Sequence, residues 1–163
     1  MHISSFWFIR HGKSIMSEYD KDPGIVQEGV LQCNNLKKSI SNNAFTSSKI
    51  YCSTKKRARE TCEIIFSNQQ VEYLDVIAEL DRREYYDFKY NNINQKIINH
   101  EKKLSQWLFD LQYDNCILVA HGGIFYLILK ILKIEYVLPY IDYAKLMHFK
   151  YLDGRWIVLQ TSV

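Results

Sequence analysis

The sequence predicts an α/β fold, a three-layer α/β/α sandwich with a mostly parallel sheet and an antiparallel edge hairpin. Two observations point to this fold. Segments with strand patterns alternate with segments of helical periodicity along most of the 163 residues. The pair Asp153-Gly154, a favoured hairpin turn, then separates two apolar stretches near the C-terminus. Because the length suits one domain and no repeat or linker is visible, residues 1–163 are expected to form a single domain.

The first five predicted elements alternate between strand and helix. Ile3–Ile9 contains an apolar run and predicts a buried strand. Val26–Ser41 carries apolar residues at roughly helical spacing, so we expect a helix there. Lys49–Cys52 predicts a short strand, and Lys56–Phe66 a helix with its apolar residues on one face. Val71–Ile77 alternates between apolar and polar residues, which indicates a strand.

The remaining five elements complete the sandwich. Ile93–Leu111 has the periodicity of a long helix with one apolar side. Cys116–Ala120 is a fully apolar run and predicts a buried strand, followed by an apolar helix over Ile124–Leu132. Leu146–Leu152 and Trp156–Gln160 flank the hairpin turn. Strands joined through helices pair in parallel and hairpin strands pair antiparallel, so the hairpin is expected at an edge of the sheet.

Composition and charge narrow the classes of protein. Apolar residues make up 47% of the chain and charged residues 24%, with only two prolines and six glycines, which is typical of a globular domain rather than a disordered chain. The net charge of +3 suits anionic ligands, but the basic residues do not gather into the stripe expected of a nucleic-acid binder. We therefore expect no nucleic-acid partner.

Cysteine usage and hydropathy indicate a cytoplasmic protein. The four cysteines lie in neither C-x-x-C pairs nor zinc-finger spacing, which predicts free thiols in a reducing cytosol and no metal or cofactor. The N-terminus has no pattern of a secretory signal. The most apolar later segment, Ile124–Leu132, is too short to span a bilayer and contains Lys130, so no membrane partner is expected. The sequence leaves the oligomeric state open.

Basic and titratable side chains lie at the carboxyl ends of three predicted strands. Arg10 and His11 close the first strand, His121 follows the fully apolar strand, and Arg57 opens the helix after the second strand. Ligands of parallel sheets bind outside these ends. Two guanidinium and two imidazole groups at one rim suit a small dianion such as phosphate. The basic helix start at Lys55–Arg59 also indicates an anion nearby, because cations are unfavourable at the positive end of a helix.

Three motifs carry a resemblance to a known family. The stretches IRHGKS, YCSTKKRARETCEII and ILVAHGG resemble the three motifs of the histidine phosphatase superfamily, which has the phosphoglycerate-mutase-like fold; the compact phosphatase branch is the best match. The segment DPGIVQEGVLQ resembles the family's connection between the first two motifs. The matching positions are Arg10-His11-Gly12, Ser53, Arg57-Ala58, Thr61, His121-Gly122, and Gly29 with Gln32 in the connection.

The resemblance implies a covalent mechanism. His11 would attack phosphorus and form a phosphohistidine that water then hydrolyses. Arg10, Arg57, His121 and Gly122 would bind the substrate phosphate, and no metal would be needed because these groups offset its charge. The residues agree with this role for His11, since neighbouring guanidinium groups disfavour a protonated imidazole and attack requires the neutral form.

The chain departs from the family pattern at three places. Ser17 stands where family members often carry Asn, and is expected to donate to phosphate with a shorter reach. Lys13 stands where Glu or Gln is common and adds positive charge at the mouth of the site. The proton donor is expected at Glu84, with Glu79 and Asp81 as rivals; some compact members that act on phosphohistidine manage without this acid.

The sequence therefore predicts a metal-independent phosphatase that hydrolyses a phosphomonoester or a phosphohistidine, on a small molecule or a phosphoprotein. Two alternatives stay open: a phosphotransferase of the phosphoglycerate mutase type, and a non-catalytic module that binds phosphate or a phosphoprotein. The physiological substrate is not identified by the sequence. Specificity is expected from residues around the rim, for which the candidates are Tyr19, Tyr85, Tyr86, Tyr90 and Lys13.

Overall fold

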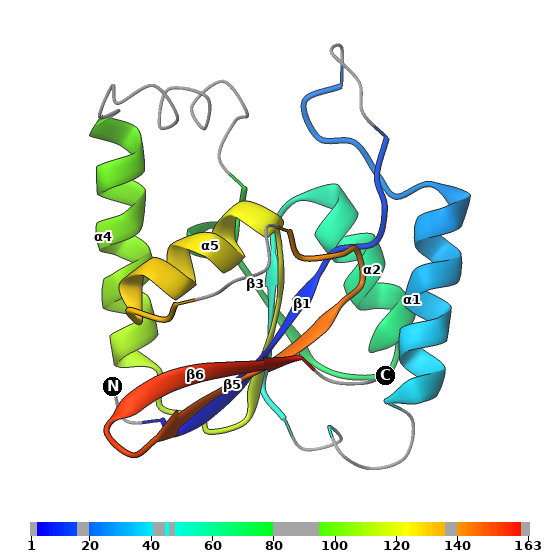
Figure 1. Cartoon of the computed structure of the whole chain (residues 1–163). Coiled ribbons are helices and arrows are strands. Elements are labelled where there is room, and N and C mark those ends of the chain that lie inside the picture. The colour runs from blue at the N-terminus through cyan, green and yellow to red at the C-terminus, as the bar shows by residue number, and fades with distance from the viewer. Residues whose placement is uncertain are drawn as a thin grey trace.

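A six-stranded mixed sheet lies between two layers of helices in a computed structural model of the chain (Figure 1). The structure describes residues 3–15, 20–40, 45, 48–79, 95–135 and 140–160. The strands are β1 (Ser5–Arg10), β2 (Ile50–Ser53), β3 (Val71–Leu74), β4 (Cys116–Ala120), β5 (Leu146–Leu152) and β6 (Arg155–Gln160). The helices are α1 (Gln27–Ser39), α2 (Lys56–Ile65), α4 (Gln95–Asp110), α5 (Gly122–Ile131) and the short 3-10 helix η1 (Asp75–Ile77).

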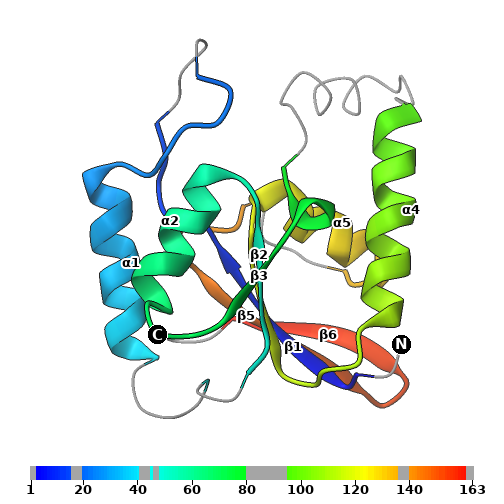
Figure 2. The same cartoon turned by 180° about the vertical axis from the view of Figure 1, so that it is seen from behind.

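The order of strands in the sheet is β3-β2-β4-β1-β5-β6. The first four of these pair in parallel, whereas β5 is antiparallel to β1 and β6 is antiparallel to β5. Helices α1 and α2 cover one face of the sheet, and α4 and α5 cover the other, as the two opposite views show (Figures 1 and 2). The predicted α/β/α sandwich with an antiparallel edge is therefore confirmed.

The hairpin between β5 and β6 follows from local backbone chemistry. Asp153 has a φ of 50° and Gly154 a φ of 81°, so both central residues of the two-residue turn lie in the left-handed region. This backbone twist matches the right-handed twist of the strands it joins, and Gly and Asp adopt it at low cost. The turn signal in the sequence thus located the antiparallel edge correctly.

Most predicted elements agree with the structure to within two residues at each described end, and one differs in kind. The segment predicted as a strand over Val71–Ile77 is a strand only to Leu74 and then turns into η1. Two contacts favour the turn: Ala78 N–H donates to the Asp75 carbonyl at 3.0 Å, and the Thr54 hydroxyl donates to the Asp75 carboxylate at 2.5 Å. The turn places Ile77 in the core with no exposed surface.

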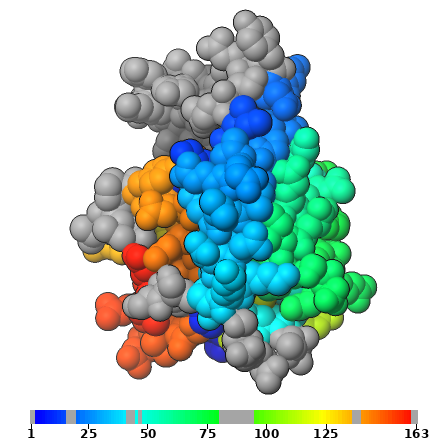
Figure 3. All heavy atoms as spheres, turned by 90° about the vertical axis from the view of Figure 1, so that its right-hand side faces the viewer, coloured from blue at the N-terminus to red at the C-terminus, as the bar shows by residue number. Residues whose placement is uncertain are grey.

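Each face of the sheet buries its own apolar core. Phe6 and Phe8 of β1 point to the α4/α5 face, where they pack with Leu104, Phe125 and Phe149. The rings of Phe6 and Phe149 stack with centroids 4.5 Å apart. The opposite face packs against α1 and α2, which lie side by side on the surface seen in Figure 3. Alternation along β1 thereby anchors both helical layers to one strand.

The topology also brings three strand ends together. Strands β2, β4 and β1 are consecutive neighbours in the sheet and run in the same direction. The residues that follow their carboxyl ends therefore lie along one rim, as expected for a ligand site in a parallel sheet. Among the helices of the described ranges, no helix is long and apolar enough to cross a membrane.

Candidate active site

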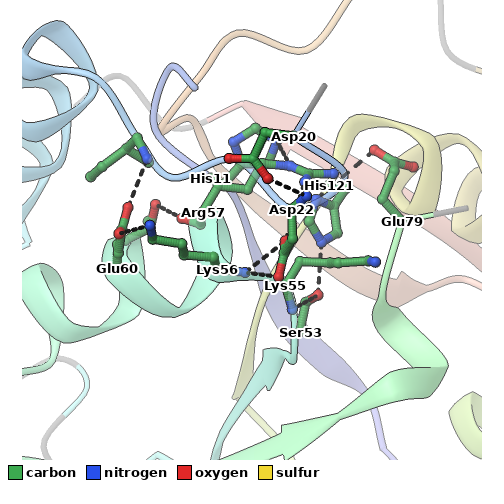
Figure 4. Close-up of polar contacts among 12 residues, drawn as sticks. His11, Asp20, Asp22, Ser53, Lys55, Lys56, Arg57, Glu60, Glu79 and His121 are labelled. Atoms are coloured by element: carbon green, nitrogen blue, oxygen red, sulfur yellow. Dashed lines mark hydrogen bonds and ion pairs between the residues drawn. The ribbon is translucent and has the colours of Figure 1, made fainter. Parts of the chain in front are cut away.

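His11, Arg57 and His121 lie close together at the rim formed by β1, β2 and β4 (Figure 4). His11 follows β1 and His121 follows β4, and their ring centroids lie 5.1 Å apart. Arg57, in the first turn of α2, donates from Nε to His11 Nε2 at 3.2 Å. Arg10, the last residue of β1, borders Gly122, where a Cβ would lie 3.5 Å from Arg10 Nε. The chain therefore brings these five residues together.

Backbone and ring contacts hold His11 in one orientation. Its N–H donates to the Ala120 carbonyl at 2.9 Å, and its carbonyl accepts from Ala144 N–H at 3.2 Å. Nδ1 lies 2.7 Å from the Gly12 carbonyl oxygen. Because a carbonyl can only accept, Nδ1 carries the proton and Nε2 presents a lone pair, which accepts from Arg57.

The electrostatic environment keeps His11 neutral. Burial is the largest cause and lowers the pKa of His11 from 6.5 to about 3. The hydrogen bond to the Gly12 carbonyl opposes this shift, and the Arg57 and Arg10 cations add to it. Burial penalises a charged imidazole, and nearby cations do so again. His11 thus offers an unprotonated Nε2, as a nucleophile requires.

His121 is also held neutral, through a different set of contacts. It is fully buried, and burial together with His11 and Arg57 lowers its pKa well below the usual value. Its Nε2 lies 2.7 Å from Ser53 Oγ. That hydroxyl oxygen also accepts Lys55 N–H at 3.2 Å, and its own O–H is able to donate to Nε2. In that arrangement His121 carries its proton on Nδ1, which makes Nδ1 a donor.

The anion indicated by the basic start of α2 is supplied within the chain by Asp22. Its two carboxylate oxygens accept the Lys56 backbone N–H at 3.0 and 3.1 Å. One of them lies 3.8 Å from Arg57 Nη1. A carboxylate at this place caps the first turn and offsets the positive end of the helix. The predicted anion is therefore a side chain of the protein itself, and no bound phosphate is needed to offset the positive helix start.

The loop after His11 requires glycine at one position. Gly12 N–H donates to Thr61 Oγ1 at 2.9 Å, and Thr61 Oγ1 donates to the Arg57 carbonyl at 2.7 Å. A Cβ at Gly12 would lie 2.8 Å from both Cys33 Sγ and the Gly29 carbonyl oxygen, which is too close. A Cβ at Gly122 would instead meet Arg10 at ordinary contact distances. Close approach therefore explains Gly12 and not Gly122.

Two tyrosines that the motifs did not indicate enclose Arg10. The guanidinium carbon lies 3.9 Å from the ring centroid of Tyr143 and 4.5 Å from that of Tyr140. Between them in sequence, the Ile141 carbonyl accepts from Arg10 Nη1. These residues are more than 100 positions from Arg10, and the chain has twelve tyrosines, so no local signal singled them out.

Several predicted positions remain untested by the geometry. Ser17 and Glu84 lie outside the described residues, as do Asp81 and the rim tyrosines 19, 85, 86 and 90. Glu79 is described, and its carboxylate lies 4.0 Å from His121 Nδ1 (Figure 4). Lys13 pairs with Glu28 at 2.5 Å at the surface. Across the ranges that the structure covers, no cluster of three or more His, Cys, Asp or Glu side chains could hold a metal ion.

Solved structures share this fold. Phosphoserine phosphatase from Entamoeba histolytica, as a mutant in complex with phosphoserine, is 19% identical over 96% of this chain and 95% of that chain, with a TM-score of 0.72. A structure of phosphoserine phosphatase from the same organism with 3-phosphoglyceric acid is 19% identical over 99% and 98%, with a TM-score of 0.71. Alpha-ribazole phosphatase from Shigella flexneri is 15% identical over 98% and 96%, with a TM-score of 0.71. At these identities the likeness establishes the fold.

Membership of a family is shown by the amino-acid sequence rather than by the structural likeness. No curated protein matched the chain. The family model of the histidine phosphatase superfamily (branch 1) matches residues 6–116, which contain the first two motifs. This match confirms the family indicated by the motifs. The chain belongs to branch 1 of the histidine phosphatase superfamily.

Proposed function

We propose that the protein is a phosphatase that hydrolyses a phosphomonoester or a phosphohistidine through a covalent phosphohistidine on His11. The observation that carries the proposal is the environment of His11 Nε2, a buried and neutral imidazole nitrogen 3.2 Å from Arg57 Nε. Membership of the histidine phosphatase superfamily supports this chemistry, and the structural neighbours named above carry the names of phosphatases.

The reaction proceeds in two displacements at phosphorus. In the first, the Nε2 lone pair of His11 forms a P–N bond while the bond from phosphorus to the leaving group breaks. The leaving group departs with the electron pair and takes a proton from an acid. In the second, water attacks phosphorus and passes a proton to the same group, now a base. The P–N bond breaks, phosphate leaves, and neutral His11 is restored.

Positive charge around Nε2 stabilises both displacements. Arg10, Arg57 and the Nδ1–H of His121 bind the non-bridging oxygens, on which charge shifts in the transition state. Gly122 and Ser17 complete the substrate-binding set. Two guanidinium groups at this rim offset the charge of a phosphate dianion, so the proposed reaction is independent of metal ions.

The proton donor is proposed among the acids that follow β3. Glu84 remains the prediction from the motifs. One observation favours Glu79 as a second candidate, because its carboxylate is partly buried and lies 4.0 Å from His121 Nδ1. The Glu84→Gln and Glu79→Gln variants distinguish the two. In the variant that has lost the true proton donor, hydrolysis of alkyl phosphates should slow by about two orders of magnitude. Hydrolysis of activated aryl phosphates should slow much less, because a phenolate departs without a proton.

Two other functions remain as alternatives. A phosphotransferase of the phosphoglycerate mutase type would use the same phosphohistidine but return the phosphoryl group to an organic acceptor. A non-catalytic module for phosphate or a phosphoprotein would need Arg10, Arg57 and His121 but would have no use for an activated His11. The low pKa of His11, about 3, therefore supports a catalytic role over simple binding.

The deciding experiment traps the intermediate. Purified protein is screened with phosphorylated small molecules, phosphopeptides and phosphohistidine proteins, then mixed with a radiolabelled substrate and quenched. Wild type should carry an acid-labile, base-stable label, and His11→Ala should carry none and turn over no substrate. His148→Ala is the matched control. This histidine lies in β5, away from the rim, and its ring stacks on that of Trp7 in β1 with centroids 3.6 Å apart. Turnover at the wild-type rate in His11→Ala would end the covalent proposal, and label transferred to an added alcohol rather than to water would indicate a phosphotransferase.

A further inference from the structure

Arg10 is a buried cation with an unusual set of partners. Its side chain is 8% exposed, and one of its donors, Nη1, is taken by the Ile141 carbonyl. Its Nε is buried and has no hydrogen-bond acceptor among the residues that the structure describes. Within the same residues, no Asp or Glu lies at ion-pair distance from its guanidinium. Buried charges in proteins are ordinarily compensated, so the groups that do contact this guanidinium bear on how it is held.

Two aromatic rings contact the Arg10 guanidinium. The guanidinium carbon of Arg10 lies over the ring of Tyr143 at 3.9 Å and over the ring of Tyr140 at 4.5 Å. Both distances are within the range in which the negative face of an aromatic ring attracts a cation. The two rings lie at 80° to each other, so they border the guanidinium from different directions. Tyr143 also faces the nucleophile, with its centroid 5.6 Å from that of His11.

The two arginines of the site are thus stabilised in different ways. Arg57 lies 3.8 Å from the carboxylate of Asp22, which neutralises part of its charge. A carboxylate beside Arg10 would do the same and would compete with a phosphate for its remaining donors. Aromatic rings attract the cation through their quadrupole but carry no net charge and no strong acceptor on their faces. They can hold Arg10 in place without neutralising its charge.

We propose that Tyr143 and Tyr140 are positioning residues for Arg10, whose guanidinium they hold at the phosphate site through cation–π contacts. The inference rests on the proposed function for its link to turnover, but the contacts themselves can be tested without it. Tyr143 has the larger part, because its ring is closer and borders His11, whereas Tyr140 is 50% exposed. The hydroxyl groups have no part in this role.

The test weakens the ring's negative face and keeps its shape. Tyr143→Phe should retain kcat/KM for p-nitrophenyl phosphate within about twofold, because a phenyl ring still attracts a cation. Phenylalanine with one, two and then three ring fluorines at position 143 should lower kcat/KM stepwise, by roughly tenfold at the third fluorine. The Kd of orthovanadate should rise in step, and the thermal midpoint should stay level. The same series at position 140 should give a smaller slope.

The control series is placed at Tyr113, an exposed tyrosine outside the site, and should be flat. A flat series at position 143, or an equal slope at position 113, would overturn the proposal, since a ring that only fills space does not respond to fluorine. The NMR shift of the Arg10 Nε–H provides a measurement independent of turnover: ring currents should displace it in wild type, and Tyr143→Leu should reduce the displacement. Should His11→Ala keep full activity, the covalent reaction fails, while the vanadate and NMR measurements still decide the role of the tyrosines.

Discussion

His11 obtains its reactive form from its surroundings rather than from its residue type. An exposed histidine titrates near pH 6.5, whereas burial in this site lowers the pKa of His11 to about 3. The Gly12 carbonyl determines which ring nitrogen carries the proton, and Arg57 occupies the other nitrogen. At the scale of single residues, burial and two contacts therefore convert a common side chain into a candidate nucleophile.

The same pKa makes a prediction about stability. Between about pH 6.5 and about pH 3 the unfolded chain binds a proton at His11 that the folded chain does not. The contribution of His11 to the free energy of unfolding is therefore complete above about pH 6.5 and is lost as the pH falls. His11→Asn should remove that loss. Urea unfolding at about pH 7 and about pH 5 should show that wild type loses about 2 kcal/mol more than the variant over this interval. Identical pH dependence of the two proteins would contradict the low pKa.

The two glycines at the site should respond differently to alanine. Gly12→Ala places a Cβ 2.8 Å from Cys33 Sγ and from the Gly29 carbonyl, so the loop must shift, and we expect a loss of about 2 kcal/mol in the free energy of unfolding with a fall in activity. Gly122→Ala meets Arg10 at 3.5 Å or more and should cost less than about 1 kcal/mol. Chemical denaturation of both variants checks the contrast, and equal losses would refute it.

Helix α2 links the site to the rest of the fold at the scale of elements. Its N-cap residue, Lys55, forms no side-chain cap, and its first turn contains no acidic residue. The capping carboxylate comes from the loop between β1 and α1, where Asp22 accepts the Lys56 N–H. Glu60 ties the same loop back to the helix by accepting the Ile25 N–H at 2.7 Å. The loop and the helix therefore position Arg57 together.

Removal of this cap should weaken the folded state and the arginine clamp at once. Asp22→Ala should lower the free energy of unfolding by about 1 kcal/mol, the usual value of a helix cap. Asp22→Asn keeps an oxygen that accepts the Lys56 N–H and loses the charge, so it should cost less, and the difference from wild type should shrink at high salt. Urea unfolding at low and high salt measures both effects. A loss in Asp22→Ala no larger than that in Asp22→Asn would argue against capping.

The sheet joins two apolar layers into one structure at the scale of the whole molecule. Strand β1 contributes Phe6 and Phe8 to one layer and Ile9 to the other.

The four cysteines are distributed between the layers: Cys116 lies in the α4/α5 layer, and the other three lie between the sheet and α1 and α2. All four are fully buried as free thiols. Burial raises the pKa of Cys116 to about 12 and also raises that of Cys33.

Thiol reactivity then tests whether the chain unfolds as a single domain. Because the thiolate is the reactive form and the thiols are buried, a disulfide reagent such as Ellman's should label the native protein slowly. In increasing urea all four cysteines should become reactive in one transition that coincides with the loss of circular dichroism. Peptide mapping of the labelled sites makes the check specific. Labelling of Cys116 at a different urea concentration from the other three would indicate that the two layers unfold separately.

The sequence by itself determined the features that depend on local chemistry. The bounds of Cys116–Ala120 and Leu146–Leu152 were predicted as the structure has them, because an unbroken apolar run and a hairpin turn are both short-range patterns. The motifs indicated the family and placed Arg10, His11 and His121 at strand ends. The order of the parallel strands was not predicted, since periodicity shows which segments have an apolar face and not which strands are neighbours.

Tertiary structure decided whatever depends on contacts between distant segments. Asp75–Ile77 forms a 3-10 helix instead of the predicted strand, because this turn buries the Ile77 side chain in the core. Asp22 became the cap of α2, and Tyr140 and Tyr143 enclosed Arg10, although neither pairing has a signature in the local sequence. The pKa of His11 likewise depends on burial and on distances to cations, which exist only after the chain has folded. The motifs thus pointed to Arg10, His11, Arg57 and His121, and how these residues act on one another was set by the fold.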